Sequence, residues 1–368
     1  MLTQQDQSQL LVEQNALPER FLLNADHYTN PTWQSIEQTH IFQRTWLYIG
    51  DSSQLTVGQV WVMHVVGQPV VITCIAPGEF RAFYNVCPHR ASILCNQVGI
   101  HRQKHLVCPY HAWVYDLKGT LVGAPSQEKF SEGFNLNDYS LKPLRLETWC
   151  GFLFLCFADD VPPLHIYLGS IPTRLGSHRR QETQLLLSQR KTVACNWKNF
   201  HDNTLCDYHV EIAHRHTLHK LQGPIKYYEH DLETYTNCLR TPVLASWQAE
   251  NSVLPELPKL SQTSFLTYGI FPNLHLLGLP NGILAWLYIE PLTTSTCALR
   301  SEVYGIPDIS PSLETLKADF DAFTSEDIVL TESVQQGYAS GNYTPGPVNQ
   351  LEARIVHQQK LILDFLSR

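Results

Sequence analysis

The sequence predicts an α+β protein with two domains, both rich in β-strands. Its 368 residues are more than one hydrophobic core usually organises. Residues 46–165 read as short strands separated by Gly and Pro turns, and helical patterns precede and follow a second β-rich region at 227–306. We therefore expect an N-terminal helical segment at 1–45, a first domain at 46–165 and a second domain at 166–368.

Composition and charge exclude several classes of function. The net charge of −8 and pI of about 6.1 offer no basic surface for nucleic acid or an anionic membrane. No apolar run reaches the ~18–20 residues that a membrane helix needs. The N-terminus has neither the basic nor the apolar region of a signal peptide. We expect a cytoplasmic protein whose ten cysteines form no disulfide framework.

Two loops within residues 87–113 alternate cysteine and histidine in a pattern that fits an iron–sulfur cluster. Cys87-Pro-His89 is followed, after eighteen residues, by Cys108-Pro-Tyr-His111. A [2Fe–2S] cluster of the Rieske kind binds two thiolates on one iron and two imidazoles on the other. A zinc site accepts the same side chains, but its usual spacing keeps Cys with Cys and His with His. The alternation therefore favours the cluster.

These loops carry a resemblance to a known family. The segments CPHRASILC and CPYHAWVYDLKGTLVGAPS closely resemble the Rieske segment of Rieske non-haem iron oxygenases, of the choline-monooxygenase and phenylpropionate-dioxygenase large-subunit type. Ala112 stands where the family usually has Gly. The resemblance implies an antiparallel β Rieske domain and a catalytic domain whose antiparallel sheet wraps around a long C-terminal helix, the helix-grip or START-like arrangement.

A second candidate metal site begins with two histidines in the segment NWKNFHDNTLCDYHVEIAH. His209 and His214 are five residues apart, which is about 140° around an ideal helix, so one regular helix would not aim both at a metal. We expect either a π-type bulge or a helix end between them. Two imidazoles and one carboxylate would form the facial triad that binds non-haem Fe(II) and leaves positions open for O₂.

The resemblance supplies the carboxylate. The segment around the two histidines is similar to the family's mononuclear-iron motif and matches His209 and His214 as its ligands. TSEDIVLTESVQQG resembles the helix that carries the third ligand, which falls on Asp327. Glu326 is the neighbouring alternative.

The sequence departs from the family at the residue that connects the two metal sites. The family usually places an acid three residues before the first histidine, where it bridges to the Rieske histidine of a neighbouring subunit. Cys206 occupies that place here, and Asp207 lies next to it. We expect Asp207 to form the bridge, because a carboxylate accepts hydrogen bonds from both imidazoles better than a thiol does. A different connection remains open.

Two metal sites of different kinds indicate an oxidoreductase that activates O₂. We expect a monooxygenase that hydroxylates or oxidatively demethylates a small organic substrate, and the alternative is an aromatic-ring dioxygenase that forms cis-diols. No G-x-G-x-x-G lies in a βαβ context, so NAD(P)H would act through a separate flavin or ferredoxin reductase. A non-catalytic electron carrier is disfavoured by the second ligand set. The resemblance implies a homotrimer in which electrons cross between subunits.

The substrate pocket is expected to draw on residues 204–290. Aromatic side chains there could enclose a quaternary ammonium by cation–π contacts, although each could equally belong to the core. No acid or base in the sequence identifies the charge of the substrate. The predicted wall residues are Tyr235, Trp247, Phe265, Tyr268, Phe271, Leu276 and Trp286.

Overall fold

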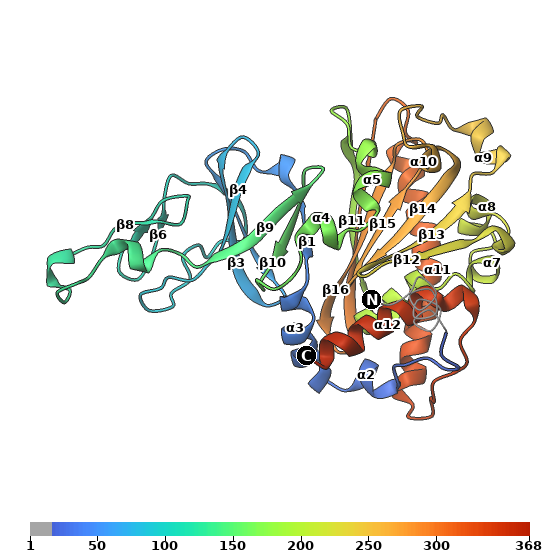
Figure 1. The fold of residues 1–368 in the computed structure, drawn as a ribbon, viewed down its shortest axis with the longest axis horizontal. Helices are drawn as coiled ribbons and strands as arrows, with labels where there is room; N and C mark the ends of the chain where they lie inside the picture. Colours follow the sequence, from blue (N-terminus) through green and yellow to red (C-terminus); the bar gives the residue numbers. More distant parts are fainter. Residues whose placement is uncertain (1–16) are drawn as a thin grey trace, which may run out of the picture. The chain divides into compact units, whose positions relative to one another are not determined.

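The computed structural model describes residues 17–368 and divides them into two compact units. One unit comprises residues 42–164, and the other combines residues 17–41 with 165–368 (Figure 1). Residues 1–16 of the predicted N-terminal segment lie outside the described residues. None of the described helices combines the length and hydropathy needed to cross a membrane.

The unit at 42–164 contains two antiparallel sheets. Seven strands in the order β1-β10-β9-β4-β3-β2-β5 form the larger sheet, and β6-β7-β8 form the smaller one. Buried residues of both sheets pack around Cys87 and Cys108 in one hydrophobic core. The strands are β1 (Leu47–Asp51), β2 (Gln59–Val65), β3 (Gln68–Ala76), β4 (Glu79–Tyr84), β5 (Gly99–Arg102), β6 (Leu106–Val107), β7 (Val114–Tyr115), β8 (Leu121–Gly123), β9 (Pro143–Trp149) and β10 (Phe152–Cys156). Short 3-10 turns are η1 (Phe42–Arg44), η2 (Ser52–Gln54), η3 (Gln127–Lys129) and η4 (Leu136–Tyr139).

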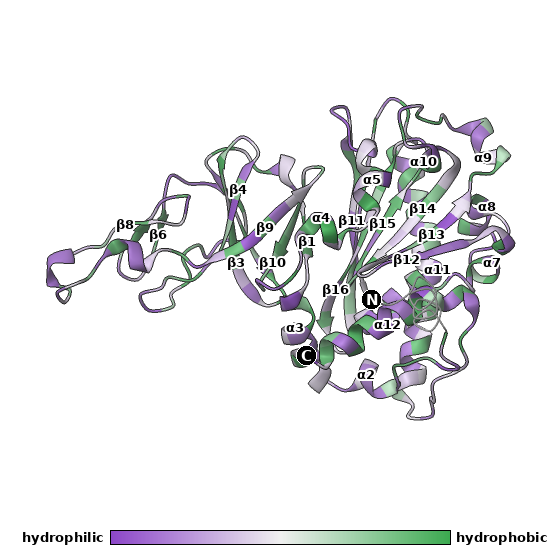
Figure 2. Cartoon of the chain, viewed as in Figure 1, coloured by the Kyte–Doolittle hydropathy of each residue, from purple (hydrophilic) through white to green (hydrophobic). Residues whose placement is uncertain are grey.

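The other unit is built on a single antiparallel sheet of seven strands, in the order β11-β17-β16-β15-β14-β13-β12. Helices α6, α11 and α12 pack against this sheet. Hydrophobic and hydrophilic residues both occur along α12, as expected for a helix with one buried side (Figure 2). The strands are β11 (Gln184–Val193), β12 (Glu229–Leu232), β13 (Thr236–Pro242), β14 (Ser264–Ile270), β15 (Leu274–Gly278), β16 (Leu284–Thr293) and β17 (Thr296–Gly305).

The helices of this unit differ greatly in length, from single turns to the 27 residues of α11. They are α2 (Ala25–Thr29), α3 (Thr32–His40), α4 (Leu164–Tyr167), α5 (Ile171–Leu175), α6 (Trp197–Leu205), α7 (Val210–Ala213), α8 (Leu218–Gln222), α9 (Ala245–Glu250), α10 (Lys259–Thr263), α11 (Leu313–Ala339) and α12 (Ala353–Leu366). Its 3-10 turns are η5 (Gly176–His178), η6 (Ile225–Tyr227) and η7 (Gln350–Glu352). Between residues 197 and 222 the chain forms the three separate helices α6, α7 and α8.

Side-chain caps define the first residues of α6, which precedes the candidate iron ligands, and of α11, which carries Asp327. Asn196 caps α6 by accepting a hydrogen bond from the backbone amide of Lys198, and Ser312 caps α11 through the amide of Thr315. Helix α6 ends at Leu205, and Cys206 has an extended backbone. The chain therefore leaves α6 just before the first candidate iron ligand.

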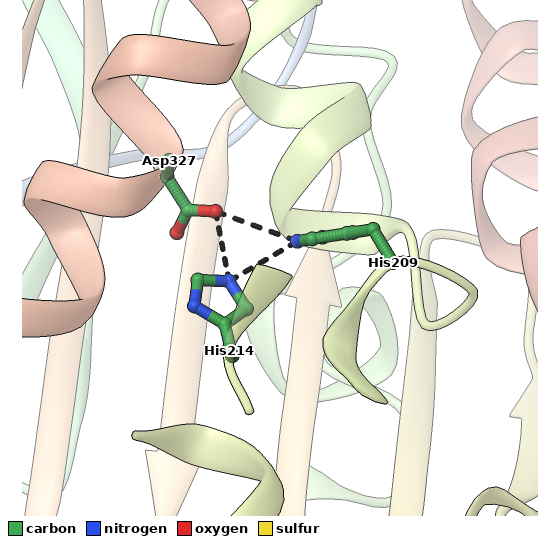
Figure 3. A group of neighbouring side chains, drawn as sticks. All are labelled: His209, His214 and Asp327. Carbon is green, nitrogen blue, oxygen red and sulfur yellow. Dashed lines mark hydrogen bonds and ion pairs between the residues drawn. The ribbon is translucent and has the colours of Figure 1, made fainter. Parts of the chain in front are cut away.

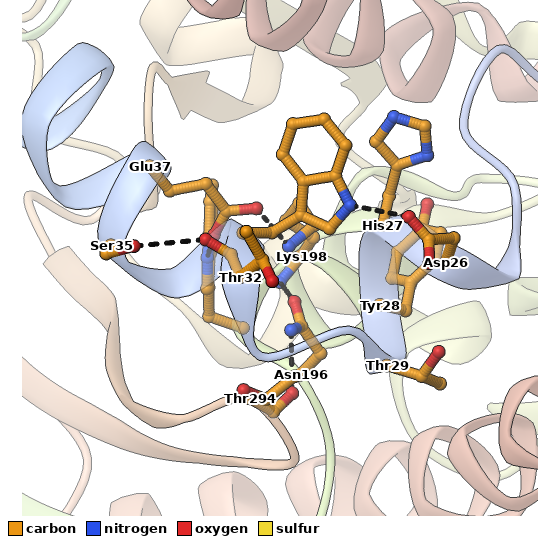
Figure 4. Close-up of polar contacts among 12 residues, drawn as sticks. Asp26, His27, Tyr28, Thr29, Thr32, Ser35, Glu37, Asn196, Lys198 and Thr294 are labelled. Atoms are coloured by element: carbon orange, nitrogen blue, oxygen red, sulfur yellow. Dashed lines mark hydrogen bonds and ion pairs between the residues drawn. The ribbon is translucent and has the colours of Figure 1, made fainter.

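A buried polar cluster attaches the N-terminal helices to α6 (Figure 4). Glu37 of α3 accepts hydrogen bonds from Lys198 Nζ and from Trp197 Nε1, the latter at 2.7 Å. The Lys198 side chain is fully buried, and its burial lowers the pKa of the ammonium against the opposing influence of Glu37. One turn further along α6, burial raises the pKa of Asp202 to about 7, and the Tyr28 hydroxyl donates to it at 2.6 Å. Helix α6 is thus held from two sides.

Replacing Glu37 by Ala leaves the Lys198 charge buried without its closest partner. We expect the free energy of unfolding to fall by about 3–5 kcal/mol, the usual loss when one member of a buried pair is removed. The double variant Glu37→Leu with Lys198→Met removes both charges and should lose markedly less. Denaturant unfolding of the iron-free protein measures both, and an equal loss in both variants would contradict the pairing argument.

Candidate metal centres

Four side chains converge at the cluster loops of the first unit. The buried thiols of Cys87 and Cys108 contact each other, and the His89 and His111 rings lie with their centroids 4.6 Å apart. The Nδ1 atoms of both histidines are buried, and neither has a hydrogen-bond partner among residues 17–368. Two thiols and two buried, unpaired imidazole nitrogens form the donor set that a Rieske [2Fe–2S] cluster requires, so the residues fit this group.

The two cluster loops share one backbone conformation. In each, the cysteine carbonyl accepts a hydrogen bond from the amide of the alanine four residues later, at 2.9 Å from Ala91 and 3.0 Å from Ala112. These alanines have φ angles of 56° and 54°, in the left-handed region. Glycine adopts this region freely, whereas a Cβ costs roughly 1–2 kcal/mol there. The loop conformation therefore explains why glycine suits the position of Ala112.

Aromatic side chains surround the cluster site. Trp113 is buried and stacks on His89, with ring centroids 4.7 Å apart and planes within 6°. The Tyr115 hydroxyl lies 3.2 Å from Cys87 Sγ, and burial and that sulfur raise the pKa of Tyr115, so the phenol keeps its proton and can donate to the thiolate. On the outer side, Tyr110 packs on His111 and is 53% exposed. The site is apolar behind the cysteines and open beside the histidines.

The second candidate centre brings together His209, His214 and Asp327 (Figure 3). The two histidine Nε2 atoms are 3.1 Å apart, and Asp327 Oδ1 lies 3.0 Å from His214 Nε2 and 3.4 Å from His209 Nε2. The histidines flank α7, one at each end, and Asp327 projects from α11. The expected helix end between the histidines is confirmed: the single-turn helix α7 starts after His209 and ends at Ala213, and the backbone of His214 is no longer helical.

Without a metal, Asp327 and its neighbours hold protons on the two histidines, and a bound divalent ion would replace the protons on the ligating nitrogens. Burial alone lowers the pKa of His209, but interactions with Asp327 and Cys206 raise it to about 9. Burial also opposes the charge on His214, whose pKa is raised overall by Asp327 and Glu326. Burial raises the pKa of Asp327, yet its hydrogen bonds with both histidines lower it overall. A divalent ion satisfies the same carboxylate, so the set fits a facial-triad iron.

Glu326, the alternative ligand, lies behind His214. Its Oε2 accepts a hydrogen bond from His214 Nδ1 at 2.7 Å and another from the Thr217 hydroxyl at 2.7 Å. This contact keeps the proton on Nδ1 and leaves Nε2 free to bind a metal. Sequence reasoning missed Thr217, which lies three residues after the second histidine in the turn between α7 and α8.

Asp207 and Cys206 have different surroundings. The Asp207 carboxylate is buried and engaged, with Oδ1 3.1 Å from Arg354 Nη1 and Oδ2 2.8 Å from His230 Nε2. Cys206 instead lies against His209. The bridging role of Asp207 stays a prediction, and it would have to be performed while the carboxylate is paired with Arg354. Nothing in the local sequence pointed to Arg354 or His230.

A cavity lies beside the three iron ligands, between the sheet and helices α6, α7, α8 and α11. The residues that line it are Phe200, Asn203, Thr204, Cys206, Asp207, His209, Val210, His214, Leu218, Gln222, Leu239, Thr267, His275, Leu277, Leu287, Phe323, Thr324 and Asp327.

None of the seven predicted wall residues is among the described residues that line this cavity. For Tyr268, Leu276 and Trp286 the reason is the alternation of side chains along a strand. Tyr268, Leu276 and Trp286 form one row across β14, β15 and β16, on the opposite face from the neighbouring row of Thr267 and Leu277. These three side chains are buried on the face of the sheet away from the cavity.

Two known families match this chain. Residues 45–144 match the Rieske [2Fe-2S] domain, and residues 172–368 match the catalytic domain of the ring-hydroxylating alpha subunit. The chain is 27% identical to the glycine betaine monooxygenase oxygenase subunit of Chromohalobacter salexigens and 28% identical to the chloroplastic choline monooxygenase of Arabidopsis thaliana. Each alignment covers 91% of this chain and 82% of the relative.

Solved structures share the fold. A quaternary ammonium Rieske monooxygenase in complex with an inhibitor has a TM-score of 0.77 at 23% identity, over 95% of this chain and 97% of its own. Naphthalene 1,2-dioxygenase from Rhodococcus has a TM-score of 0.73 at 19% identity, over 94% of both chains. These matches confirm the predicted fold class, a Rieske domain joined to a catalytic domain with an antiparallel sheet and C-terminal helices.

Replacing Tyr115 by Phe removes the hydroxyl beside Cys87. We expect the cluster's reduction potential to fall, because a hydrogen bond to the sulfur favours the more negative reduced state. A loss of about 1 kcal/mol corresponds to roughly 40 mV for one electron. Redox titration followed by visible absorption measures the shift. Tyr110→Phe is the control, since its hydroxyl bonds to Arg90, and an equal shift in both variants would refute the assignment.

Asp327→Ala should abolish the mononuclear iron while leaving the visible spectrum of the cluster unchanged. Glu326→Gln should keep the iron but weaken its binding about 10–100-fold, because His214 loses the carboxylate that orients it. Titration with Fe(II) under anaerobic conditions measures both variants. Ser325→Ala, at an exposed neighbouring position, should match the unaltered protein. Full iron binding by Asp327→Ala would show that the carboxylate ligand lies elsewhere.

Proposed function

Since this chain belongs to the ring-hydroxylating alpha subunit family, we propose that it is the oxygenase component of a Rieske-type enzyme system. It takes electrons from a separate NAD(P)H-dependent reductase and uses O₂ to hydroxylate or oxidatively demethylate a small organic substrate. The observation that carries the proposal is the convergence of His209, His214 and Asp327 in the same chain as the cluster loops. Ring dihydroxylation to cis-diols would use the same ligands, so the substrate decides between the two reactions.

The residue roles follow from the geometry of the two sites. Cys87 and Cys108 would hold one iron of the cluster, and His89 and His111 the other. His209, His214 and Asp327, which point toward one another in Figure 3, would hold the mononuclear iron, and the cavity that they line would take the substrate. The cluster supplies single electrons, and the mononuclear ferrous ion provides the open positions at which O₂ is activated.

The supporting residues orient these ligands without binding a metal. Glu326 fixes the tautomer of His214 and is itself held by Thr217. Asp207 acts as a positioning residue, because its pairing with Arg354 and His230 fixes the turn that precedes His209. Cys206 contacts His209 at the place where the connection between the metal sites is expected. The cavity combines apolar side chains such as Leu239, Leu277 and Leu287 with polar ones, and the apolar side chains limit the water around the reacting carbon.

We assign the electron route to neighbouring subunits of a homotrimer. Apolar residues are exposed beside both metal sites: Tyr110 and Val107 at 53% and 48% near the cluster, and Tyr208 and Ile212 at 50% and 80% near the iron ligands. Such residues are suited to a contact between subunits. One structural neighbour, a quaternary ammonium Rieske monooxygenase, is described with inter-subunit electron transfer.

The domain boundaries and the cellular location are part of the same proposal. We divide the chain at residues 1–45, 46–165 and 166–368, and assign the N-terminal segment to the catalytic domain. The ion pair between Glu37 and Lys198 supports that assignment. We also place the protein in the cytoplasm, in agreement with its ten unpaired cysteines.

Mixed complexes test the function and the electron route together. Asp327→Ala removes the iron site and His111→Ala impairs the cluster, so each variant alone should be inactive with a surrogate reductase, NADH and O₂. Complexes formed by co-expression should recover about a quarter of the normal rate if electrons cross between randomly assorted subunits. The readout is substrate-stimulated O₂ uptake with product mass, over a panel of N-methylated betaines and uncharged aromatic compounds.

As a control, Asp327→Ala must keep its cluster, which visible absorption measures. His111→Ala must keep its mononuclear iron, which the iron content measures. Activity of the unaltered protein without recovery in the mixed complexes would exclude transfer between subunits. Absence of stimulated O₂ uptake from the unaltered, iron-loaded protein with the whole panel would count against the oxygenase function.

A further inference from the structure

The sheet side of the cavity presents two rows of side chains. Leu239, Thr267 and Leu277 lie in register across β13, β14 and β15. His275 of β15 lies in the next row, between Gly269 of β14 and Leu287 of β16. The wall is therefore mostly aliphatic, and a single imidazole interrupts it.

The cavity has no spare negative charge to accept a cation. The described residues that line it include two carboxylates, Asp327 and Asp207. Asp327 is an iron ligand in the proposed function, and one carboxylate leaves a ferrous ion with a net positive charge. Asp207 is neutralised by Arg354, whose side chain is fully buried. A buried quaternary ammonium would therefore lack an ionic partner, which makes its desolvation costly.

The cavity also lacks the aromatic side chains that bind ammonium groups best. Among the described lining residues, Phe200 and Phe323 carry the aromatic hydrocarbon rings, and neither Trp nor Tyr occurs. Trp and Tyr are the stronger and more common partners in cation–π contacts. Charge and composition thus agree that the cavity favours an uncharged ligand.

Among the described residues that line the cavity, Asn203 of α6 and His275 of the sheet each have a buried polar atom without a hydrogen-bond partner, and His275 lies on the sheet wall. It is 2% exposed, and its Nε2 has no hydrogen-bond partner within the part of the chain that the structure describes. Burial, together with Arg354 and His201, lowers the pKa of His275 well below its ordinary value, so the ring is neutral. A neutral imidazole nitrogen can donate to a carbonyl or pair with a hydroxyl. Leaving it unpaired in the interior is unfavourable, and a ligand would remove that penalty.

We propose that the cavity binds an uncharged, mostly apolar substrate with one hydroxyl or carbonyl group, which His275 Nε2 hydrogen-bonds to orient the molecule at the iron. This inference rests on the proposed function, because it takes the cavity beside the iron ligands as the substrate site. It distinguishes this protein from its relatives that act on choline and glycine betaine.

Choline and its carbon analogue dimethylbutanol, in which a quaternary carbon replaces the nitrogen, provide a matched pair of probes. They share size, shape and the hydroxyl group and differ in charge. Nitric oxide added to the reduced, iron-loaded protein forms a ferrous nitrosyl whose electron paramagnetic resonance signal responds to ligands in the cavity without turnover. We expect dimethylbutanol to saturate the response at a concentration at least tenfold below that of choline. Equal or tighter binding of choline, or no response to either, overturns the proposal.

Variants at His275 test the hydrogen bond itself. His275→Leu should weaken dimethylbutanol binding at least tenfold and change binding of the hydrocarbon neohexane less than about twofold, because neohexane has no group for the imidazole. His275→Gln should recover part of the affinity for the alcohol. Leu276→Met, on the opposite face of β15, is the matched control and should change neither. Equal losses for both ligands in His275→Leu would assign His275 a packing role only.

The nitrosyl signal distinguishes a failure of the proposed oxygenase function from a failure of the proposed substrate class. If it does not form, or forms equally in Asp327→Ala, the iron site and with it the proposed function fail. If it forms only with Asp327 present but shows no preference for the alcohol, the oxygenase assignment stands and the substrate class is wrong.

Discussion

The buried ion pair between Arg354 and Asp207 is the interaction on which the iron site depends. Arg354 also donates to Asn237 Oδ1 at 2.8 Å and to the Thr267 carbonyl at 3.1 Å, so one guanidinium connects α12 with β13, β14 and the turn after α6. The Asp207 amide donates to the Leu351 carbonyl at 3.1 Å, a second attachment to the C-terminal segment. That turn leads directly to His209. The position of the first iron ligand is therefore set by residues nearly 150 positions away in the sequence.

This arrangement shows how two histidines five residues apart can share a metal. A continuous helix would separate them by about 140°. Because the turn at Asp207 is held by Arg354, α6 can stop at Leu205 and a new single-turn helix can start at His209. The ligands then occupy the two ends of α7, where the backbone is free to leave helical geometry. Glu326 of α11 orients the ring of His214 through a hydrogen bond to its Nδ1 atom. Helix α11 therefore supplies one ligand, Asp327, and also the residue that orients a second ligand, His214.

The sequence predicted what is encoded locally and missed what depends on pairing across the fold. The Cys and His spacings predicted the cluster loops, and the family motif led to His209, His214 and Asp327, which the structure brings together. Tyr268, Leu276 and Trp286 were wrong as pocket walls because they lie on the other face of the sheet, and aromatic content cannot reveal which face a strand residue occupies. Arg354 and His275 are distant in sequence from both motifs, so only the folded chain associates them with the site.

The ion pair between Arg354 and Asp207 affects both the position of the turn before His209 and the charge of the ligand that the cavity favours. A carboxylate at Asp207 lines the cavity and, if unpaired, would attract a cationic substrate. Its pairing with Arg354 removes that attraction while holding the turn in place. A cavity whose described lining offers no free carboxylate favours ligands that are themselves neutral, because an unpaired charge loses its hydration without compensation. In this proposal, the pairing of Asp207 with Arg354 affects which substrate charge the cavity accepts without changing a metal ligand.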